Sequence, residues 1–245
     1  MHTLSVIIPT FNEISYLEDA VASVRFAQQI IVIDSYSTDG TAELAKRLGC
    51  EVMQRKFDHF SAQKNAAIAL AKGDWILFID ADERVTTKLK LEILDTLKNP
   101  KHQGYKLRFP HYFMNRFLYH KVDRVTRLVK NDGVHFTGEV HEKLHVNGSI
   151  GQLEAFMIHY TYKGLFHTLS KKNSYAWFQA DMARQKGKKV TLLHLFFKPL
   201  YRFFSAYILK KGFMDGLPGL ALASVNAYGV FSRYVKMMLL ERKME

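Results

Sequence analysis

The apolar stretch Trp75–Ile79, followed by Asp80, Asp82 and Glu83, constrains the fold more than any other feature. Five consecutive large apolar residues are typical of a strand buried on both faces, as in the middle of a parallel sheet. Because side chains alternate along extended chain, Asp80 and Asp82 are expected on the same side beyond the strand. Two such carboxylates favour Mg²⁺ or Mn²⁺. The alternative is that both acids are solvated or cap a helix starting near Thr86.

The first hundred residues alternate short apolar strands with amphipathic helices. The expected strands are 4–8, 30–33, 51–53 and 75–79, and the expected helices are 15–26, 41–48 and 61–71. Strands joined by helices of this length imply right-handed crossovers and a parallel, doubly wound sheet. Ligands bind at the carboxyl edge of such sheets. The polar residues expected at that edge are Thr10, Asn12, Glu13, Asp34, Asp39, Asp80 and Asp82.

From Gly104 onward the pattern changes to short runs in which apolar and polar residues alternate. Such runs indicate half-exposed strands in a mixed or antiparallel arrangement. Their outward face is basic. Guanidinium groups match phosphate geometry well, so phosphate binding is one interpretation and a solvated basic face is the other. The residues concerned are Arg116, Arg124, Arg127 and Lys130.

The last third is expected to be helical. Residues 165–186 predict one helix, residues 192–210 predict a second that mixes aromatic with basic residues, and residues 217–231 form an apolar run. That run is shorter than the roughly twenty residues needed to cross a bilayer. We therefore expect a helix pair lying in the membrane interface, with Lys and Arg toward anionic head groups. The alternative is that the aromatic side chains cover the sheet.

Charge is distributed unevenly along the chain, whose net charge is +12. Residues 1–84 contain 8 Lys and Arg against 12 Asp and Glu, whereas residues 85–245 contain 27 against 11. The basic part favours a polyanion, which could be nucleic acid, an anionic membrane or a phosphorylated lipid. The single cysteine, Cys50, excludes an internal disulfide and fits a reducing compartment. The N-terminus lacks the pattern of a secretory signal, so we expect a cytoplasmic protein.

Four segments together resemble family-2 glycosyltransferases with the GT-A fold: Ser5–Glu13, Ile33–Thr41, Gln63–Asn65 and Ile79–Asp82. A looser similarity, around residues 140–142 and 212–216, is to bacterial β-1,4-glucosyltransferases of the lipopolysaccharide core. The resemblance implies an α/β, Rossmann-like, mostly parallel sheet with helices on both faces, followed by a C-terminal helical, membrane-facing appendage. The expected parts are a nucleotide-sugar half at 1–100, an acceptor half at 101–162 and the helical segment at 163–245.

The resemblance also implies an activity: inverting transfer of a sugar, with glucose as our prediction, from a UDP-sugar to a hydroxyl of a cell-envelope glycolipid. Mn²⁺ or Mg²⁺ would be bound on the diphosphate by Asp82. Ser35 follows Asp34 where the family commonly has a second acid, which leaves the nucleobase contact less defined. The residues that the resemblance places on the nucleoside, the phosphates or the metal are Pro9, Thr10, Glu13, Asp34, Lys64 and Asp80.

The acceptor hydroxyl needs a carboxylate or an imidazole to remove its proton. We predict Glu142 as this base, with His141 beside it and Glu139 as a second choice. The alternative for Glu142 is a surface strand residue paired with a lysine. His159, at the end of a predicted strand, is a candidate third metal ligand, and a structural histidine is the alternative.

Two other classes of protein compete with this prediction. A phosphatase of the haloacid-dehalogenase type also carries Asp-x-Asp after a buried strand, but there the motif usually follows the first strand, and here it follows the fourth. A basic nucleic-acid or membrane-binding module is the non-enzymatic alternative, although no nucleic-acid-binding motif is recognisable. We predict a metal-dependent hexosyltransferase, peripheral on the inner face of the cytoplasmic membrane, that binds a UDP-sugar, a glycolipid acceptor and no nucleic acid.

Overall fold

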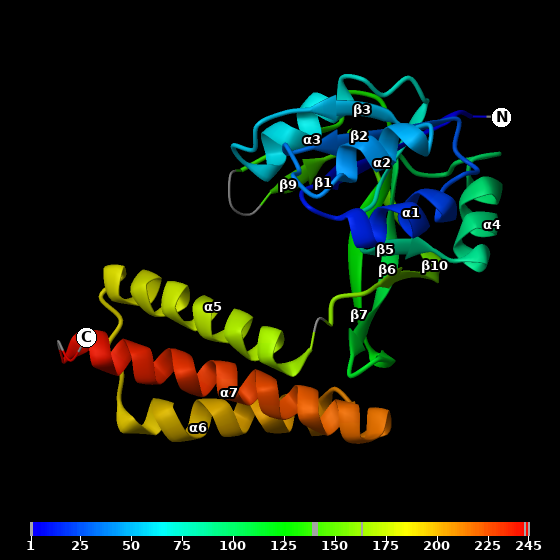
Figure 1. The fold of residues 1–245 in the computed structure, drawn as a ribbon. Coiled ribbons are helices and arrows are strands. Elements are labelled where there is room, and N and C mark those ends of the chain that lie inside the picture. The colour runs from blue at the N-terminus through cyan, green and yellow to red at the C-terminus, as the bar shows by residue number, and fades with distance from the viewer. Residues whose placement is uncertain (1, 139–141, 163, 243, 245) are drawn as a thin grey trace. The chain divides into compact units, whose positions relative to one another are not determined.

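The fold is known from a computed structural model, which describes residues 2–138, 142–162, 164–242 and 244 (Figure 1). The chain forms two compact units. The first consists of Met1–Phe109 and Asp123–His159, and the second of Pro110–Val122 and Tyr160–Glu245. The predicted division at residues 100 and 162 stays a prediction.

The first unit begins with alternating strands and helices, as predicted. The strands β1 (Leu4–Thr10), β2 (Gln29–Asp34), β3 (Glu51–Gln54) and β4 (Trp75–Phe78) lie in the order β3-β2-β1-β4, and all three neighbouring pairs are parallel. The connecting helices are α1 (Ile14–Ser23), α2 (Thr41–Arg47) and α3 (Phe60–Ile68). The carboxyl ends of β1, β2 and β4 therefore meet at one edge.

The sheet continues past β4 as a mixed sheet, in the order β4-β7-β6-β10-β5. Strand β7 (Arg116–Lys130) is antiparallel to β4, β10 (Ile150–His159) is parallel to β6 (Gly104–Phe113), and β5 (Glu83–Val85) is antiparallel to β10. Helix α4 (Thr87–Thr96) follows β5, and β8 (His135–Thr137) pairs with β9 (Lys143–His145) as a separate ribbon. The parallel order predicted for the N-terminal strands and the mixed arrangement predicted beyond Gly104 are thus both found in the complete sheet.

Helices cover both faces of the parallel strands because alternate strand residues point to opposite sides. One buried cluster joins Val6 and Leu77 of the strands to Leu17 of α1 and Ile93 of α4. The other joins strand residues such as Ile7, Ile31 and Phe78 to Ala67 of α3 and to Phe136 of β8. Continuous apolar strands are thereby buried on both sides.

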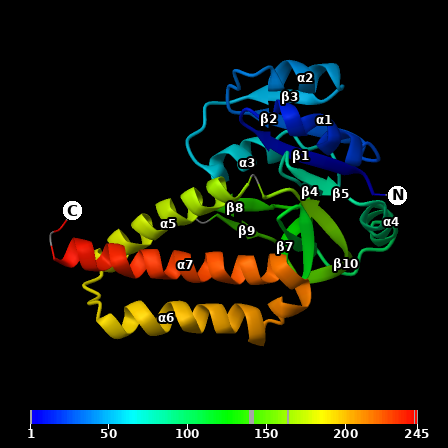
Figure 2. The ribbon, with the colours of Figure 1, turned by 60° about the horizontal axis from the view of Figure 1, so that its bottom comes forward.

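The second unit contains three long helices, α5 (Leu165–Gln185), α6 (Leu192–Phe204) and α7 (Gly216–Glu241). Helix α7 lies between the other two (Figures 1 and 2). A π-helical turn at Ser205–Leu209 and a 3₁₀ turn at Gly212–Asp215 connect α6 to α7. A small core of Phe113, Leu118 and Val225 joins the strand residues of this unit to α7.

Helix α7 continues ten residues past the end of the apolar run at Phe231. Its later basic residues are accommodated by α5: Lys236 donates to the Asn173 carbonyl at 2.7 Å, and Arg233 donates to Gln179 at 3.2 Å. Helix α7 therefore continues through its basic residues Arg233 and Lys236. Within the described residues, no helix is long and apolar enough to span a bilayer.

Candidate functional site

The loops after β1 and β2 are joined by side-chain hydrogen bonds around one buried carboxylate. Asp34 accepts from the Thr10 hydroxyl at 3.0 Å and from the Ser37 backbone N–H at 2.9 Å. The Ser37 hydroxyl accepts from the Asn12 backbone N–H, and Asn12 in turn accepts from the Thr38 N–H at 2.9 Å. Asn12 has a φ of 56°, a left-handed conformation that asparagine tolerates better than most residues. The two loops thus form one rigid edge.

Two aromatic side chains stand out of this edge. Phe11 is 60% exposed and Tyr36 is 55% exposed, and both belong to the loops that Asp34 holds together. Neither ring was predicted to belong to the site. The sequence pattern that could have indicated them is an aromatic residue within a short polar loop directly after a buried strand. Exposed rings at a ligand-binding edge can stack on a planar base.

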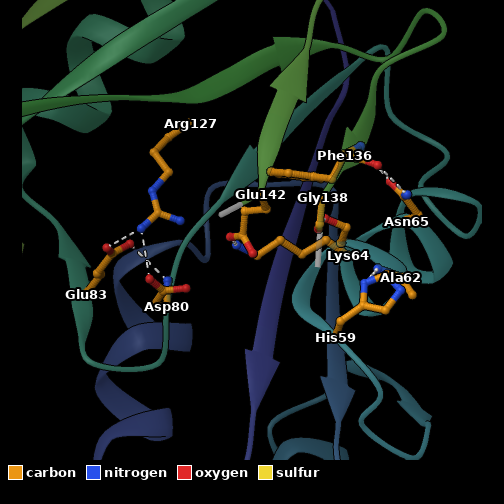
Figure 3. A network of polar contacts seen from close by, with 11 residues as sticks. His59, Ala62, Lys64, Asn65, Asp80, Glu83, Arg127, Phe136, Gly138 and Glu142 are labelled. Atoms are coloured by element: carbon orange, nitrogen blue, oxygen red, sulfur yellow. Dashed lines mark hydrogen bonds and ion pairs between the residues drawn. The ribbon is translucent and has the colours of Figure 1, made fainter. Parts of the chain in front are cut away.

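A compact ion-pair cluster lies just beyond β4. Arg127 of β7 donates to Asp80 at 2.8 Å and to Glu83 at 2.6 Å (Figure 3). The Asp80 backbone N–H donates to the second oxygen of Glu83 at 2.9 Å. Arg84 fixes the same turn, because it donates to the carbonyls of Ala81 and Tyr16, both at 2.7 Å. Arg127, predicted to bind phosphate, instead joins two carboxylates.

The charges in this cluster shift the pKa values of its two acids in opposite directions. Burial opposes ionisation of Asp80, but the cations Arg127 and Lys64 outweigh it and lower its pKa to about 2. Glu83 is fully buried, and burial raises its pKa to about 7, with a further contribution from the Asp80 charge. The two acidic partners raise the pKa of Arg127 despite its burial. Asp80 is therefore the ionised member of the pair at neutral pH.

Asp82 and His159 meet next to this cluster. His159 Nε2 lies 3.2 Å from Asp82 Oδ1, and His159 Nδ1 lies 3.8 Å from Glu83 Oε1. Burial disfavours the charged imidazole, but the hydrogen bond and charge of Asp82 raise the pKa of His159 above its usual value. Strand β5 pairs with the end of β10 in the register Glu83 to His159, which brings the two side chains together.

This pair fits part of a divalent metal site. One carboxylate and one imidazole are at ligand spacing, and Mg²⁺ or Mn²⁺ commonly takes few protein ligands and completes its shell with water and phosphate oxygens. Among the described residues, no group of three or more His, Cys, Asp or Glu side chains is arranged to hold a metal ion. Asp80, predicted as a metal ligand, points one oxygen at Arg127.

Lys64 and Glu142 form a second ion pair at this edge. The Lys64 ammonium contacts Glu142 Oε1 and lies 5.1 Å from the centre of the Phe136 ring (Figure 3). Asn65, next on α3, makes two hydrogen bonds to the backbone of Phe136, at 2.8 and 2.9 Å. Helix α3 therefore holds both the lysine and the ribbon that leads to Glu142. The alternative for Glu142 was a surface residue paired with a lysine. Glu142 does pair with a lysine, but Lys64 is buried and Glu142 is half-buried.

The structure brings most of the predicted site residues to this edge. Thr10 and Asp34 are buried there, with the Asp34 oxygens already bonded to protein donors, and the nucleobase contact expected of Asp34 stays a prediction. Pro9 and Glu13 are half-buried beside them. His141 and Glu139 lie outside the described residues. The remaining basic candidates do not join the ion-pair clusters: Arg116 and Arg124 are exposed, and Lys130 lies 3.6 Å from Asp132.

Glu83 and Ser37 are two polar residues of the site that were not assigned to it from the sequence. Glu83 stands in the same acidic run as Asp80 and Asp82, but its full burial depends on Arg127, forty-four positions later. Ser37 bonds Asp34 and the Asn12 backbone, and nothing in the sequence separates it from Ser35. Both assignments required contacts between distant segments.

A rigid carboxyl edge that carries paired acids, cations and exposed rings defines an α/β enzyme that binds its ligand there. The family model described as glycosyl transferase family 2 matches residues 5–194. The chain belongs to this family. The predicted family is thereby confirmed, and the match favours the glycosyltransferase over the phosphatase and the non-enzymatic module.

Relatives match along nearly the whole chain. An uncharacterized glycosyltransferase of Rickettsia felis is 28% identical, with 97% of this chain and 90% of that protein covered. The lipopolysaccharide core biosynthesis glycosyltransferase LpsC of Rhizobium meliloti is 26% identical, with 94% and 93% covered. Among solved structures, glucosyl-3-phosphoglycerate synthase from Mycobacterium tuberculosis, in complex with Mn²⁺ and UDP, has a TM-score of 0.39 at 24% identity over 44% of each chain. That similarity is too low to carry an argument about this chain.

Proposed function

We propose that this glycosyltransferase moves a hexose, with glucose as the first candidate, from a UDP-sugar to a hydroxyl of a cell-envelope glycolipid, with inversion. The observation that carries the proposal is the Asp82 and His159 pair, 3.2 Å apart at the carboxyl edge of the parallel strands. It lies beside the ionised Asp80 in a chain whose family transfers sugars. The acceptor class is supported by the likeness to LpsC, a lipopolysaccharide core biosynthesis glycosyltransferase.

The nucleoside would lie on the edge formed by the loops after β1 and β2. Phe11 and Tyr36 offer exposed rings for the base, and the hydrogen bonds around Asp34 keep both loops in one position. Pro9, Thr10 and Glu13 line the same edge. A platform that is already ordered loses little conformational entropy when the ligand binds.

The diphosphate would lie near Asp82 and His159. A divalent cation bound there stabilises the negative charge that grows on the departing diphosphate. Because a ligating imidazole must be neutral, His159 would have to give up the proton that Asp82 stabilises on it before it could hold the ion. Arg127 keeps Asp80 ionised and holds one of its oxygens in place beside the two proposed ligands.

Glu142 would take the proton from the acceptor hydroxyl as that oxygen attacks the anomeric carbon. The bond to the diphosphate breaks on the opposite side of the sugar, so the configuration inverts. Lys64 holds the Glu142 carboxylate through their ion pair, and the ring of Phe136 limits where the ammonium can move. A carboxylate positioned in this way contributes about 10²- to 10⁴-fold to the rate of such reactions.

Calorimetric titration of UDP, with and without Mn²⁺, tests the donor site. We expect binding that requires the metal in the unmodified protein and is lost in Asp82→Ala. The matched control is Asp95→Ala, because Asp95 is an exposed aspartate of α4 whose ion pair is with Lys98 on the surface. If UDP binds equally well to Asp82→Ala and to Asp95→Ala, the donor site is elsewhere.

Substitution of the proposed base separates chemistry from binding. Glu142→Gln should keep UDP affinity within about twofold while kcat, measured with UDP-glucose and a lipopolysaccharide-derived acceptor, falls by about 10²-fold or more. Glu154→Gln is the control, because Glu154 is also a strand-region acid paired with a basic residue, Arg108, at 2.7 Å. An unchanged kcat in Glu142→Gln would remove Glu142 from the reaction.

A further inference from the structure

Helix α6 carries a continuous apolar face that no described residue of the second unit covers. None of its residues is buried, and its half-buried side, which includes Leu195 and Phe203, is the side packed on α7. The opposite side exposes large apolar residues at three- and four-residue spacing, each at least half exposed: Leu192, Leu193, Phe196, Phe197, Leu200 and Phe204. So many exposed apolar side chains on one helix mark an interaction surface.

A basic cavity opens beside this face. It has a volume of about 410 Å³ and is lined by residues of α5, α6, α7 and the turn between α5 and α6. No acidic side chain among the described residues lines it. Its basic lining consists of Lys186, Lys188, Lys189, His194, Lys198 and Arg233.

Internal contacts hold the aromatic and guanidinium groups of the cavity in place. The Tyr234 ring lies 4.8 Å from the Arg233 guanidinium and stacks on the His194 ring at 5.6 Å. Gln179 fixes Arg233 from α5, and Thr191 fixes His194 at the start of α6. The four lysines are exposed, and within the described residues none of them forms an ion pair. The cavity therefore has a fixed floor and an exposed cationic rim, which suits a phosphate group.

The charge of the surrounding segment agrees with an anionic partner. Residues 160–245 contain 15 Lys and Arg against 4 Asp and Glu. An anionic bilayer attracts such a segment, and an amphipathic helix with Phe and Leu on one side enters the boundary between head groups and acyl chains. A lipid surface is the partner that offers both phosphate and hydrocarbon.

We propose that the second unit docks on an anionic phospholipid bilayer, with the outer face of α6 in the interface and a lipid phosphate in the basic cavity. A nucleic acid could pair its phosphates with the lysines and stack its bases on Phe196 and Phe197. It offers no hydrocarbon for Leu192, Leu193 and Leu200, which make up half of the face, so the lipid surface is the better fit. The proposal does not depend on the donor site, since every residue that carries it lies in the other unit.

Partition of the full-length protein onto sedimented vesicles tests the docking. Vesicles of phosphatidylcholine that contain about 30% phosphatidylglycerol are compared with vesicles of phosphatidylcholine alone. This share gives the surface potential of an anionic leaflet. We expect binding to the anionic vesicles that is at least tenfold stronger. Equal binding to both compositions would overturn the proposal.

Two substituted proteins separate the apolar face from the cavity. Phe196→Gln with Phe197→Gln should weaken partition at least tenfold, whereas Phe57→Gln with Phe60→Gln, an exposed pair in the first unit, should not. Replacing Lys188, Lys189 and Lys198 by Gln should weaken it by about a hundredfold, because each basic residue near an anionic surface contributes about 1 kcal/mol. The matched control replaces the exposed Lys98, Lys101 and Lys106 by Gln. Equal partition of either variant and its control contradicts the proposed docking.

Two soluble competitors distinguish the lipid from other anions. We expect that neither inorganic phosphate nor a single-stranded oligonucleotide, at the concentration of accessible lipid phosphate, displaces the protein from anionic vesicles. Displacement by the oligonucleotide would make the surface a nucleic-acid site, and displacement by phosphate would make the cavity a site for a free anion. Either result overturns lipid docking and leaves the donor-site titration unaffected.

Discussion

Glu83 shows how one buried side chain organises the candidate site. It has no exposed surface, and it bonds Arg127 and the backbone N–H of Asp80. Burial of a carboxylate is costly unless donors surround it. Here two donors and a nearby imidazole do so, which explains why Asp80, Asp82 and His159 stand in fixed positions around it.

The raised pKa of Glu83 predicts how stability changes with pH. In the folded protein burial raises its pKa to about 7, from the ordinary value of 4.5. The folded state therefore binds the proton more tightly, so its contribution to stability is complete below about pH 4.5 and is lost as the pH rises through 7. In metal-free buffer, the unfolding free energy of the unmodified protein should fall as the pH rises from about 5 to about 7, the window set by these two pKa values. The unfolding free energy of Glu83→Gln should fall less over the same window. Urea unfolding at several pH values measures this.

The control for that prediction is Glu92→Gln. Glu92 lies on α4, and its carboxylate accepts hydrogen bonds from the backbone N–H groups of Glu154 and Ala155, both at 2.8 Å. Its pH profile should parallel that of the unmodified protein in the same window. If Glu83→Gln and the unmodified protein lose the same unfolding free energy over this window, Glu83 is ionised in the folded state throughout it. The prediction that its pKa is raised would then be wrong.

Arg127 carries the opposite charge in the same cluster, and its loss leaves two acids without their cation. Arg127→Met should destabilise the first unit by about 3–5 kcal/mol, the usual cost of removing one partner from a buried ion pair. Arg124→Met should change stability by no more than about 0.5 kcal/mol, because Arg124 is exposed on the same strand. Denaturant unfolding of both variants decides whether the cluster is structural as well as functional.

At the scale of elements, α3 connects the sheet edge to the ribbon of β8 and β9. The Asn65 side chain bonds both the backbone N–H and the carbonyl of Phe136, as a neighbouring strand would do. Lys64, one position earlier, reaches Glu142 beyond the ribbon. One helix therefore sets the position of the proposed base relative to the donor edge.

Asn65→Ala should detach this ribbon without unfolding the sheet. Two backbone groups lose their partner, which costs about 1–3 kcal/mol locally. Hydrogen exchange of β8 and β9 should accelerate, and kcat should fall while UDP affinity is retained. Asn147→Ala is the control, because Asn147 makes a single exposed bond to the Asp132 carbonyl. Unchanged exchange in β8 would show that the ribbon is held by Phe136 packing alone.

Elements with local signals were predicted well, and elements that depend on partners were not. The strands at 30–33 and 75–79 lie within or overlap β2 and β4, because a continuous apolar run has few alternatives to burial. The apolar run was expected to span residues 217–231, and helix α7 continues beyond it to Glu241, where α5 provides oxygens for Lys236. Thr86, and neither Asp80 nor Asp82, caps α4 by accepting from the Leu89 N–H.

At the scale of the whole molecule, the two units divide the candidate functions between them. The residues of the donor site belong to the first unit, and the basic cavity with its apolar helix belongs to the second. Each unit has its own buried core. A ligand bound to one unit is therefore expected to stabilise that unit first.

Hydrogen exchange with and without UDP and Mn²⁺ tests this division. At about 100 times its Kd, a ligand adds about 2.7 kcal/mol to the state that binds it. We expect slower exchange in β1, β2 and β4, and unchanged exchange in α5 and α7. Anionic vesicles should give the reverse pattern, with protection of α6. Protection of α5 by UDP would show that the units do not respond separately.

The sequence by itself determined the family, the parallel strands and the positions of the polar residues at their ends, because these depend on local patterns of burial and on short motifs. Tertiary structure alone decided which of those residues meet. Glu83 acquired its burial from Arg127, Asp82 its partner from the last strand of the sheet, and Glu142 its lysine from α3. Such contacts join residues 44 to 78 positions apart, and no local pattern specifies them, since they arise only when strands pair and helices pack.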